Sequence, residues 1–269
     1  MFISVITTFH NSESFIFDCL QSFQSIKNIS SVEHLLIDDG SNDRSREIIN
    51  ENRRNNQIII GREKVGRGKA LNLGIQSARG DYICILDSDD ILNSSWIDYC
   101  LEIDLSSKSI HESVLFGDVI HFSALDSFNI EKKFDKISNL AFREINNHHL
   151  YLRNPIPHVG TLIPKSKLNL VGNYTESRSA QFDWDLWLKL ESVNTKFLHT
   201  KNYVAAKRLH RNQSFERKSH MSYTLKGVFL QISRSISQKY YLFPLVFSIA
   251  LVRIIWSIFP QSFRSRFYR

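Results

Sequence analysis

The sequence predicts an α/β fold in which helices flank a mostly parallel, doubly wound β-sheet. Short β-rich runs alternate with helical patterns over the first 117 of its 269 residues, an order that is typical of β-α-β units. Several of these runs are almost continuously apolar, as expected for strands that are buried on both faces. Hydrophobic residues make up 42% of the chain, which is enough for a sizeable core.

Five runs are rich in β-branched and aromatic residues and are expected to form strands. They are residues 2–9, 34–39, 57–61, 81–87 and 113–118. Ligands of such sheets bind beyond the carboxyl ends of the strands. Four acidic residues fall at these ends: Asp38, Asp39, Asp87 and Asp89.

Helices are expected between these strands. Residues 15–23 have apolar side chains at helical spacing, and Asn11 or Ser12 could cap the start of that helix. A second helix is expected at 70–78, with Gly80 as its stop signal. After an irregular, connecting or inserted segment at 118–155, the sequence predicts a strand at 159–164, a short helix at 165–172 and an amphipathic helix at 182–192.

The charge of the chain is unevenly distributed. Residues 201–269 contain 13 Lys or Arg and one acidic residue, whereas the remainder has 21 basic and 26 acidic residues. Such a basic tail suits nucleic acid or an anionic membrane surface. Nucleic acid is the weaker alternative, because the density of apolar residues near the C-terminus would not face a polyanion.

The apolar run between Pro244 and Pro260 predicts how the tail meets a membrane. It has 15 residues and contains Arg253, so it is shorter than the roughly 20 apolar residues of a membrane span. A helix that lies in the interface of an anionic bilayer is therefore expected. A buried C-terminal helix and a true span are the alternatives.

The cysteines and the N-terminus indicate a cytosolic protein. Cys19, Cys84 and Cys100 are odd in number and lack the spacing of a metal site, so buried, reduced thiols are expected. The chain passes from Met1 directly into a β-rich run without a basic region or a cleavage site, which argues against a signal peptide.

Two acidic turns, "IDDGS" (37–41) and "LDSDD" (86–90), follow two of the expected core strands. Carboxylates one residue apart can converge on Mg²⁺ or Mn²⁺, whose remaining ligands are phosphate oxygens and water. The same residues also suit an ordinary turn and helix cap. A nearby basic loop with Lys64, Arg67 and Lys69 could approach a diphosphate at the start of a helix, or it could simply be solvated.

Longer fragments occur in a distinctive order: "SVITTFHNSESFIFDCLQSF", "DDGS", "GRGKALNLGIQSARGDYICILDSDD", "HVGTLIPKSKLNLVGNY" and "FDWDLWLKL". Arg208, His210 and a displaced Ser214 follow them. Together these fragments, over about residues 3–215, resemble the inverting glycosyltransferases of family 2 with the GT-A fold, of the bacterial surface-polysaccharide type. The resemblance implies a GT-A, Rossmann-like sheet flanked by helices, followed here by a C-terminal amphipathic helical tail.

The resemblance also implies a role for each matching residue at the donor site. Asp39 would contact the nucleotide base, with Thr8 and Glu13 in the same pocket. Asp89 would ligate the divalent cation, Mg²⁺ or Mn²⁺, and Asp87 would hold the ribose or support the metal.

Four further residues receive roles. Lys69 would contribute to nucleotide-sugar binding and His210 would ligate the metal or touch phosphate, while His158 would line the acceptor cleft. Asp90 is expected instead to begin the helix that contains Trp96.

Asp183 matches the acidic residue that serves the family as general base. Inverting transfer is a single in-line displacement, so the acceptor hydroxyl must lose its proton opposite the departing diphosphate. Asp183 could instead be an acid that stabilises the first turn of its helix, and Asp185 would point to another face. Phe182 stands where the family has Glu, and Thr8-Phe9-His10 replaces its Pro-Thr-Tyr.

The predicted activity is transfer of a sugar, from a UDP-hexose or UDP-HexNAc, to a hydroxyl of a lipid-linked saccharide in polysaccharide or O-antigen biosynthesis. The expected organisation is a GT-A domain at 1–215, with a nucleotide-binding half at 1–117 and an acceptor-binding half at 118–215, and a membrane-associating tail at 216–269. The expected location is cytoplasmic, peripheral on the inner face of the cell membrane. A sugar nucleotidyltransferase and an inactive nucleotide-sugar- or glycan-binding module are the alternatives.

Overall fold

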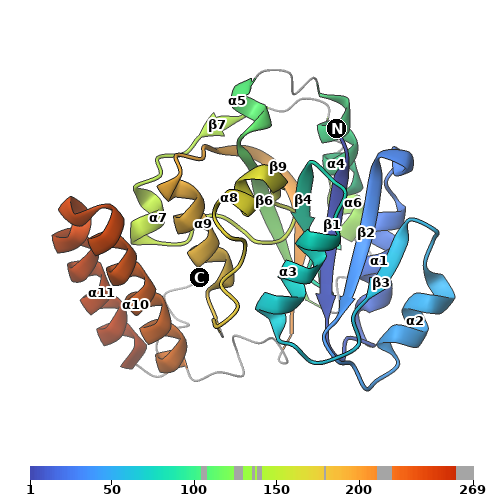
Figure 1. The fold of residues 1–269 in the computed structure, drawn as a ribbon, viewed down its shortest axis with the longest axis horizontal. Coiled ribbons are helices and arrows are strands. Elements are labelled where there is room, and N and C mark those ends of the chain that lie inside the picture. The colour runs from blue at the N-terminus through green and yellow to red at the C-terminus, as the bar shows by residue number, and fades with distance from the viewer. Residues whose placement is uncertain are drawn as a thin grey trace.

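A computed structural model shows a mixed β-sheet with helices on both faces (Figure 1). It describes residues 1–103, 108–123, 130–134, 137, 141–178, 180–210 and 220–258. Within these residues nine strands form one sheet: β1 Ile3–Phe9, β2 Val32–Asp38, β3 Gln57–Ile60, β4 Tyr82–Ile85, β5 Ile91–Leu92, β6 Val114–Ser123, β7 Arg143–Glu144, β8 Leu162–Pro164 and β9 Phe197–Leu209. The α/β fold that the sequence predicts is confirmed.

The strand order is β3-β2-β1-β4-β8-β6-β9-β5, and β7 pairs with β9. Strands β1 to β4 run parallel to one another, as the β-α-β pattern predicts. Strand β8 enters antiparallel between β4 and β6. The carboxyl ends of β1, β2 and β4 therefore lie at one edge of the sheet, which is where the acidic turns emerge.

The helices are α1 Ile16–Gln24, α2 Ser45–Asn52, α3 Arg67–Ser77, α4 Ser94–Glu102, α5 Lys108–His111, α6 Ile130–Lys133, α7 His149–Leu152, α8 Lys165–Leu170, α9 Phe182–Ser192, α10 His220–Gln238 and α11 Phe243–Ile258. They cover two large hydrophobic cores, one on each face of the sheet, and a smaller third cluster forms around Ile91 and Phe122. Along β1, Val5 packs with α1 and α4, and Ile6 packs with α3, because successive side chains of a strand point to opposite faces. The three cysteines are buried, free thiols, as expected.

Three local expectations are wrong in detail. The carbonyl of Ser12 accepts the first amides of the turn before α1, whereas its hydroxyl bonds Ser88, so neither Asn11 nor Ser12 caps that helix through its side chain. Helix α3 ends at Ser77 and not at Gly80. Glycine is required at position 80 for another reason, because a Cβ there would lie 2.5 Å from the Ser4 backbone nitrogen. Residues 118–123 continue β6 instead of belonging to an irregular segment.

The tail forms a helical hairpin, α10 and α11, at one end of the molecule (Figure 1). It packs on α9 and α7, and Arg234 of α10 bonds Asp185 of α9 at 2.9 Å. Arg253, the charge within the apolar run, bonds Gln231 at 3.1 Å and lies over the Trp184 ring. This arginine therefore faces the protein rather than the outer side of the hairpin.

The outer side of α11 is apolar. Among its exposed side chains are Leu245, Phe247, Leu251, Val252, Ile255 and Ile258. Helical structure runs from Tyr240 to Ile258, which makes 19 residues that are long and apolar enough to cross a membrane by length and composition alone. The run is longer than the sequence suggests, because Pro244 sits in the first turn of α11, where proline is tolerated. Ser214 and the basic end of the tail, 259–269, lie outside the described residues.

Candidate active site

Three carboxylates converge at the carboxyl end of β4. Asp87, Asp89 and Asp90 each offer an oxygen atom, and these atoms lie within 4.8 Å of one another. Asp87 and Asp89 are partly exposed and Asp90 is buried. The acidic turn therefore brings its charges to one point, as a metal site requires.

Asp90 does not cap the following helix, so that expectation is wrong. Strand β5 intervenes between Asp90 and α4, and the helix is capped by Asn93, whose side chain accepts from the Ser95 amide. One oxygen of Asp90 accepts from the Arg208 backbone amide at 2.9 Å. The other is buried and has no hydrogen-bond partner among the described residues. Burial and the charges of Asp89 and Asp87 raise the pKa of Asp90 well above its usual value.

His210 reaches the same cluster from the end of β9. Its Nε2 lies 2.9 Å from Oδ2 of Asp89, and its Nδ1 is buried without a partner in the described part of the chain. The pairing of β5 with β9 makes this contact possible, because it aligns Ile91 with Ala206. The structure thus brings together the two residues that the sequence assigns to a metal.

The donor atoms fit a divalent cation. Carboxylate oxygens suit Mg²⁺ and Mn²⁺, and an imidazole nitrogen is better matched to Mn²⁺. The unpartnered buried oxygen of Asp90 and the nearby Asp87 and Asp89 leave negative charge that a cation would balance. Asp89 and His210 would hold the ion, with Asp87 or Asp90 beside them.

Asp87 is held by a neighbouring arginine. The guanidinium of Arg67, the first residue of α3, lies 2.5 Å from Oδ1 of Asp87, and His158 lies 3.9 Å from the same oxygen. Burial would raise the pKa of Asp87, but the charges of Arg67, His158 and Lys207 together lower it below its usual value. The basic loop therefore reaches the site through Arg67, while Lys69 is exposed.

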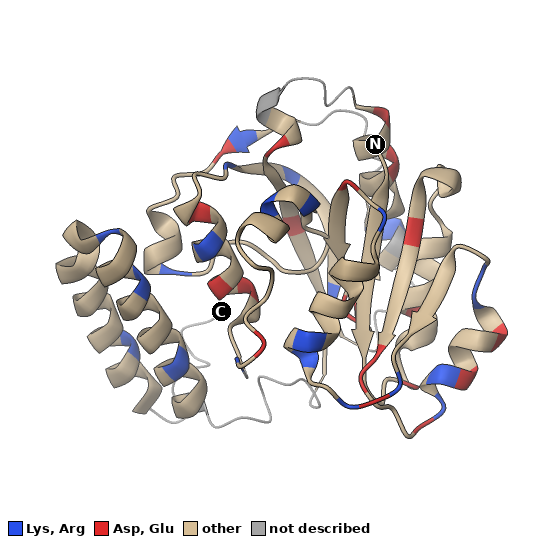
Figure 2. Ribbon diagram, in the orientation of Figure 1, with Lys and Arg blue, Asp and Glu red and all other residues tan. Residues whose placement is uncertain are grey.

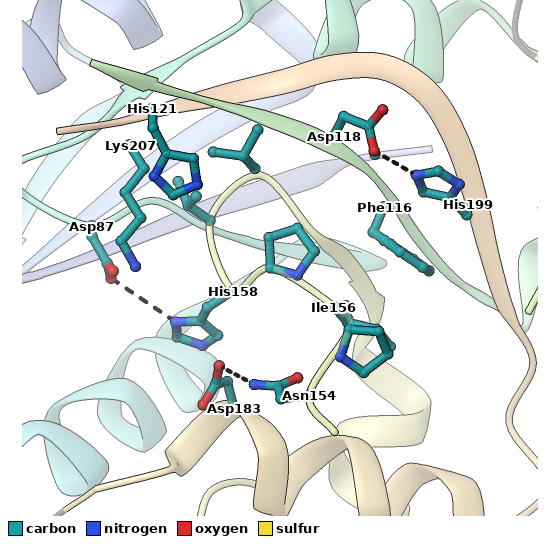
Figure 3. A pocket seen from close by; sticks show the side chains of 15 residues that line it. Asp87, Phe116, Asp118, His121, Asn154, Ile156, His158, Asp183, His199 and Lys207 are labelled. Carbon is teal, nitrogen blue, oxygen red and sulfur yellow. Dashed lines mark hydrogen bonds and ion pairs between the residues drawn. The ribbon is translucent and has the colours of Figure 1, made fainter. Parts of the chain in front are cut away.

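Asp87 and Asp183 both line a cavity of about 380 Å³ (Figure 3). Asp183 lies in the first turn of α9, and its Oδ2 accepts from Nδ2 of Asn154 at 2.8 Å. Asp185 points away as expected, into a buried contact with Thr175 and Arg234. Asp183 thus lines the cavity from the first turn of its helix, and its role as general base stays a prediction.

Two residues that line the cavity, Asn154 and Lys207, are not identified by the sequence analysis. Asn154 orients Asp183 from a loop that the sequence leaves irregular. Lys207 enters from β9, and the alternation of the strand could have shown that it faces away from Arg208. His158 lines the cavity, and its Nε2 lies 2.7 Å from the Tyr174 hydroxyl; its place in an acceptor cleft stays a prediction. Burial lowers the pKa of His158.

The predicted nucleotide contacts lie around the end of β1. Asp39 is buried, and its Oδ1 accepts from the amides of Val65 and Gly66 at 2.7 and 2.8 Å. Glu13 is exposed and accepts a hydrogen bond from the Arg44 amide. Thr8, the second-last residue of β1, is half-buried. A role of these residues, and of Lys69, in nucleotide binding stays a prediction.

Parts of the chain are similar to a protein family and to known proteins. Residues 4–105 match the model described as glycosyl transferase family 2. Chondroitin synthase of Escherichia coli is 28% identical over 196 residues, which cover 71% of this chain and 26% of the relative. The putative glycosyltransferase EpsH of Bacillus subtilis is 35% identical over 102 residues, 36% of this chain and 28% of the relative. The chain therefore spans about a quarter of the length of these two relatives.

An archaeal relative and a solved structure match over more of their length. An uncharacterised glycosyltransferase of Methanocaldococcus jannaschii is 25% identical over 232 residues, 82% of this chain and 77% of the relative. The crystal structure of S. aureus TarS 1–349 in complex with UDP-GlcNAc superposes with a TM-score of 0.69 at 17% identity, over 89% of this chain and 68% of that one. The family model, the relatives and the shared GT-A fold agree that residues 4–105 carry a glycosyl transferase family 2 domain.

Proposed function

We propose that this chain is an inverting glycosyltransferase that uses a UDP-hexose or UDP-HexNAc donor. The observation that carries the proposal is that Asp87 and Asp183 line the same cavity. Asp87 belongs to the carboxylate cluster that would bind the metal, and Asp183 is the separate candidate for the base. The structural neighbour TarS is solved with UDP-GlcNAc and with UDP, which supports UDP as the nucleotide. Residues 1–117 would bind this donor and residues 118–215 the acceptor.

The residues of the chain divide the chemistry between two sides of the cavity. Asp183 would take the proton from the acceptor hydroxyl, and Asn154 would orient its carboxylate through the 2.8 Å hydrogen bond. Arg67 and Lys207 add positive charge beside Asp87, where charge develops on the departing diphosphate. A divalent cation, when bound by Asp89 and His210, would supply further charge neutralisation there.

The first prediction is a metal-dependent turnover of a UDP-sugar. With Mn²⁺ or Mg²⁺, the purified protein should release UDP slowly from UDP-GlcNAc or a related UDP-sugar in water, and faster with an acceptor saccharide. A chelator such as EDTA should stop the release. Luminescent detection of UDP measures the rate for each donor and metal. If the protein binds UDP-sugars but turns over none of them with any acceptor tested, it would instead be an inactive binding module.

The acceptor would be a lipid-linked saccharide, and the protein would work at the inner face of the cell membrane. The hairpin α10–α11 supports this, because its outer side exposes large apolar side chains while Arg253 turns inward. An amphipathic surface of this kind lies in the interface of a bilayer. The tail, residues 216–269, is also strongly basic, and its helices α10 and α11 carry Lys and Arg but no Asp or Glu (Figure 2). Basic residues are attracted to anionic lipids.

The second prediction tests the hairpin as a membrane anchor. The double substitution Val252→Asp and Ile255→Asp should weaken co-sedimentation with phosphatidylglycerol vesicles at least tenfold, because burial of each such side chain contributes about 1.5–3 kcal/mol. Both side chains are more than half exposed in the free protein, so the fold should tolerate the change. Leu170→Asp on α8, where the leucine is 64% exposed, is the matched control. Equal binding of the double variant and the control would refute the anchor.

A further inference from the structure

The cavity at the active site continues to a second polar group that the mechanism above does not use. Figure 3 shows Asp87, His158 and Asp183 on one side of the cavity, and Asp118 with His199 on the other. The carboxylate oxygen Oδ1 of Asp118 lies 2.9 Å from Nε2 of His199. The two side chains are 50% and 28% exposed, respectively, so a bound molecule could reach this pair.

An irregular strand pairing builds this end of the cavity. Strands β6 and β9 change register on both sides of Asp118. Successive residues of a regular strand face opposite sides, yet Asp118 and Val119 both line the cavity. Gly117 allows the distortion, because a Cβ there would lie 2.4 Å from the Asn202 carbonyl oxygen. Such bulges re-aim side chains and are frequent beside active sites.

The imidazole of His199 is held in place from its other side. The ring of Phe116, its register partner on β6, lies with its centroid 5.1 Å away. The paired Asp118 and His199 therefore present an acceptor oxygen and a nitrogen heterocycle side by side. Adjacent hydroxyl groups of a sugar, each of which donates and accepts, match such a pair.

The charge of the cavity favours an uncharged ligand. Its described lining contains three carboxylates, of Asp87, Asp118 and Asp183, and one ammonium, of Lys207. Arg67 pairs with Asp87. Burial and the charge of Lys207 lower the pKa of His121, so this histidine adds no positive charge at neutral pH. A uronate or a phosphate would meet the negative charges of Asp118 and Asp183 in a confined space.

The wall between the two ends is apolar. It consists of Pro155, Ile156, Pro157 and Val159. Pyranose rings have an apolar face of C–H groups that packs on such surfaces, while their hydroxyls need polar partners. The cavity therefore combines an apolar wall with a polar pair at its far end.

We propose that Asp118 and His199 form an acceptor subsite, which binds adjacent hydroxyls of an uncharged terminal pyranose while another hydroxyl of that sugar, or of the next one, reaches Asp183. The inference rests on the proposed function and deepens it, because it names the acceptor class. Asp118 and His199 act in this proposal as binding residues, and the proton transfer remains with Asp183.

The experiment compares Asp118→Ala and His199→Ala with the wild-type protein on matched acceptors. Octyl β-glucoside and octyl β-galactoside are the uncharged probes, and octyl β-glucuronide is the charged one. The donor is the UDP-sugar that the wild-type protein hydrolyses fastest. UDP release without acceptor is measured for each variant, and saturation-transfer NMR in the presence of UDP and the diamagnetic ion Mg²⁺ reports acceptor binding directly.

The wild-type protein should bind an uncharged glycoside and not the glucuronide. Each variant should raise the KM or Kd for that glycoside at least tenfold more than it changes the rate of hydrolysis without acceptor. Glu144→Gln on β7, which breaks an exposed ion pair with Lys196 just before β9, should change neither quantity. Circular dichroism checks that each variant is folded.

Three results would overturn the subsite. They are preference for the glucuronide, an equal loss of hydrolysis and acceptor binding in the variants, and no binding of any uncharged glycoside by an enzyme that hydrolyses its donor. In each case hydrolysis by the wild-type protein leaves the proposed function standing. Absence of hydrolysis with every donor, by contrast, would count against the proposed function itself.

Discussion

Asp183→Asn should lower the rate of sugar transfer by about 10²–10⁴-fold, the usual contribution of a general base. Asparagine keeps the size of the side chain and can still accept from Asn154 through its carbonyl oxygen, so the hydrogen bond at this position survives. What is lost is the ability to take a proton from the acceptor hydroxyl. The kcat for transfer should therefore fall, while the Kd for UDP, measured by calorimetry, should stay close to the wild-type value.

Asp185→Asn is the matched control two residues further along α9. Its carboxylate is buried and bonds Arg234 and Thr175 instead of facing the cavity. Loss of this charge should cost about 1–3 kcal/mol of folding free energy and lower the Tm, with little effect on the kcat of the folded protein. The two variants should thus separate catalysis from stability. Wild-type transfer by Asp183→Asn would assign the base to another group.

Asp89→Ala should abolish Mn²⁺ binding at concentrations that saturate the wild-type protein. The substitution removes a carboxylate that lies within 4.8 Å of two others and 2.9 Å from His210, and it leaves the cluster with less charge to hold a dication. Isothermal titration calorimetry or Mn²⁺ electron paramagnetic resonance measures this without reference to activity. Transfer should fall by at least 10²-fold, because the charge on the departing diphosphate is no longer neutralised.

His210→Ala sharpens this test. An imidazole nitrogen favours Mn²⁺ over Mg²⁺, so its removal should weaken Mn²⁺ binding more than Mg²⁺ binding and reduce the preference for Mn²⁺. Asp81→Asn, at the opposite end of β4 where the carboxylate accepts from the Phe2 amide, should leave metal binding as it is. Tight Mn²⁺ binding by Asp89→Ala would place the metal elsewhere.

Much of the fold of residues 1–117 could be predicted from local pattern. The strands β1 to β4 are rich in apolar and β-branched residues, and every residue of β2 and β4 is buried in the fold. A run of this kind is stable as a strand only between other layers, so its position along the chain is readable from composition. The same reasoning places Asp87 and Asp89 at the edge where ligands bind, because they follow the last buried residue of β4.

The errors arose where a local signal competed with a distant partner. Ser12 is a good capping residue, but its hydroxyl is occupied by Ser88, 76 residues further along the chain. Asp90 has the side chain of a helix cap, yet it accepts from the amide of Arg208, 118 residues away. A capping hydrogen bond and a tertiary one have similar energies, about 1 kcal/mol, so local preference alone does not decide between them.

By itself the sequence determined the alternation of strands and helices in residues 1–117, the family resemblance and the residue types available for chemistry. Tertiary structure decided which of these residues meet. The antiparallel pairing of β8 with β4, together with the pairing of β5 with β9, places His210 beside Asp89. The register shift at Asp118 directs Asp118, which pairs with His199, toward the cavity. The physical reason is that hydrophobic periodicity depends on neighbouring residues, whereas a site depends on strand register, which only the assembled sheet defines.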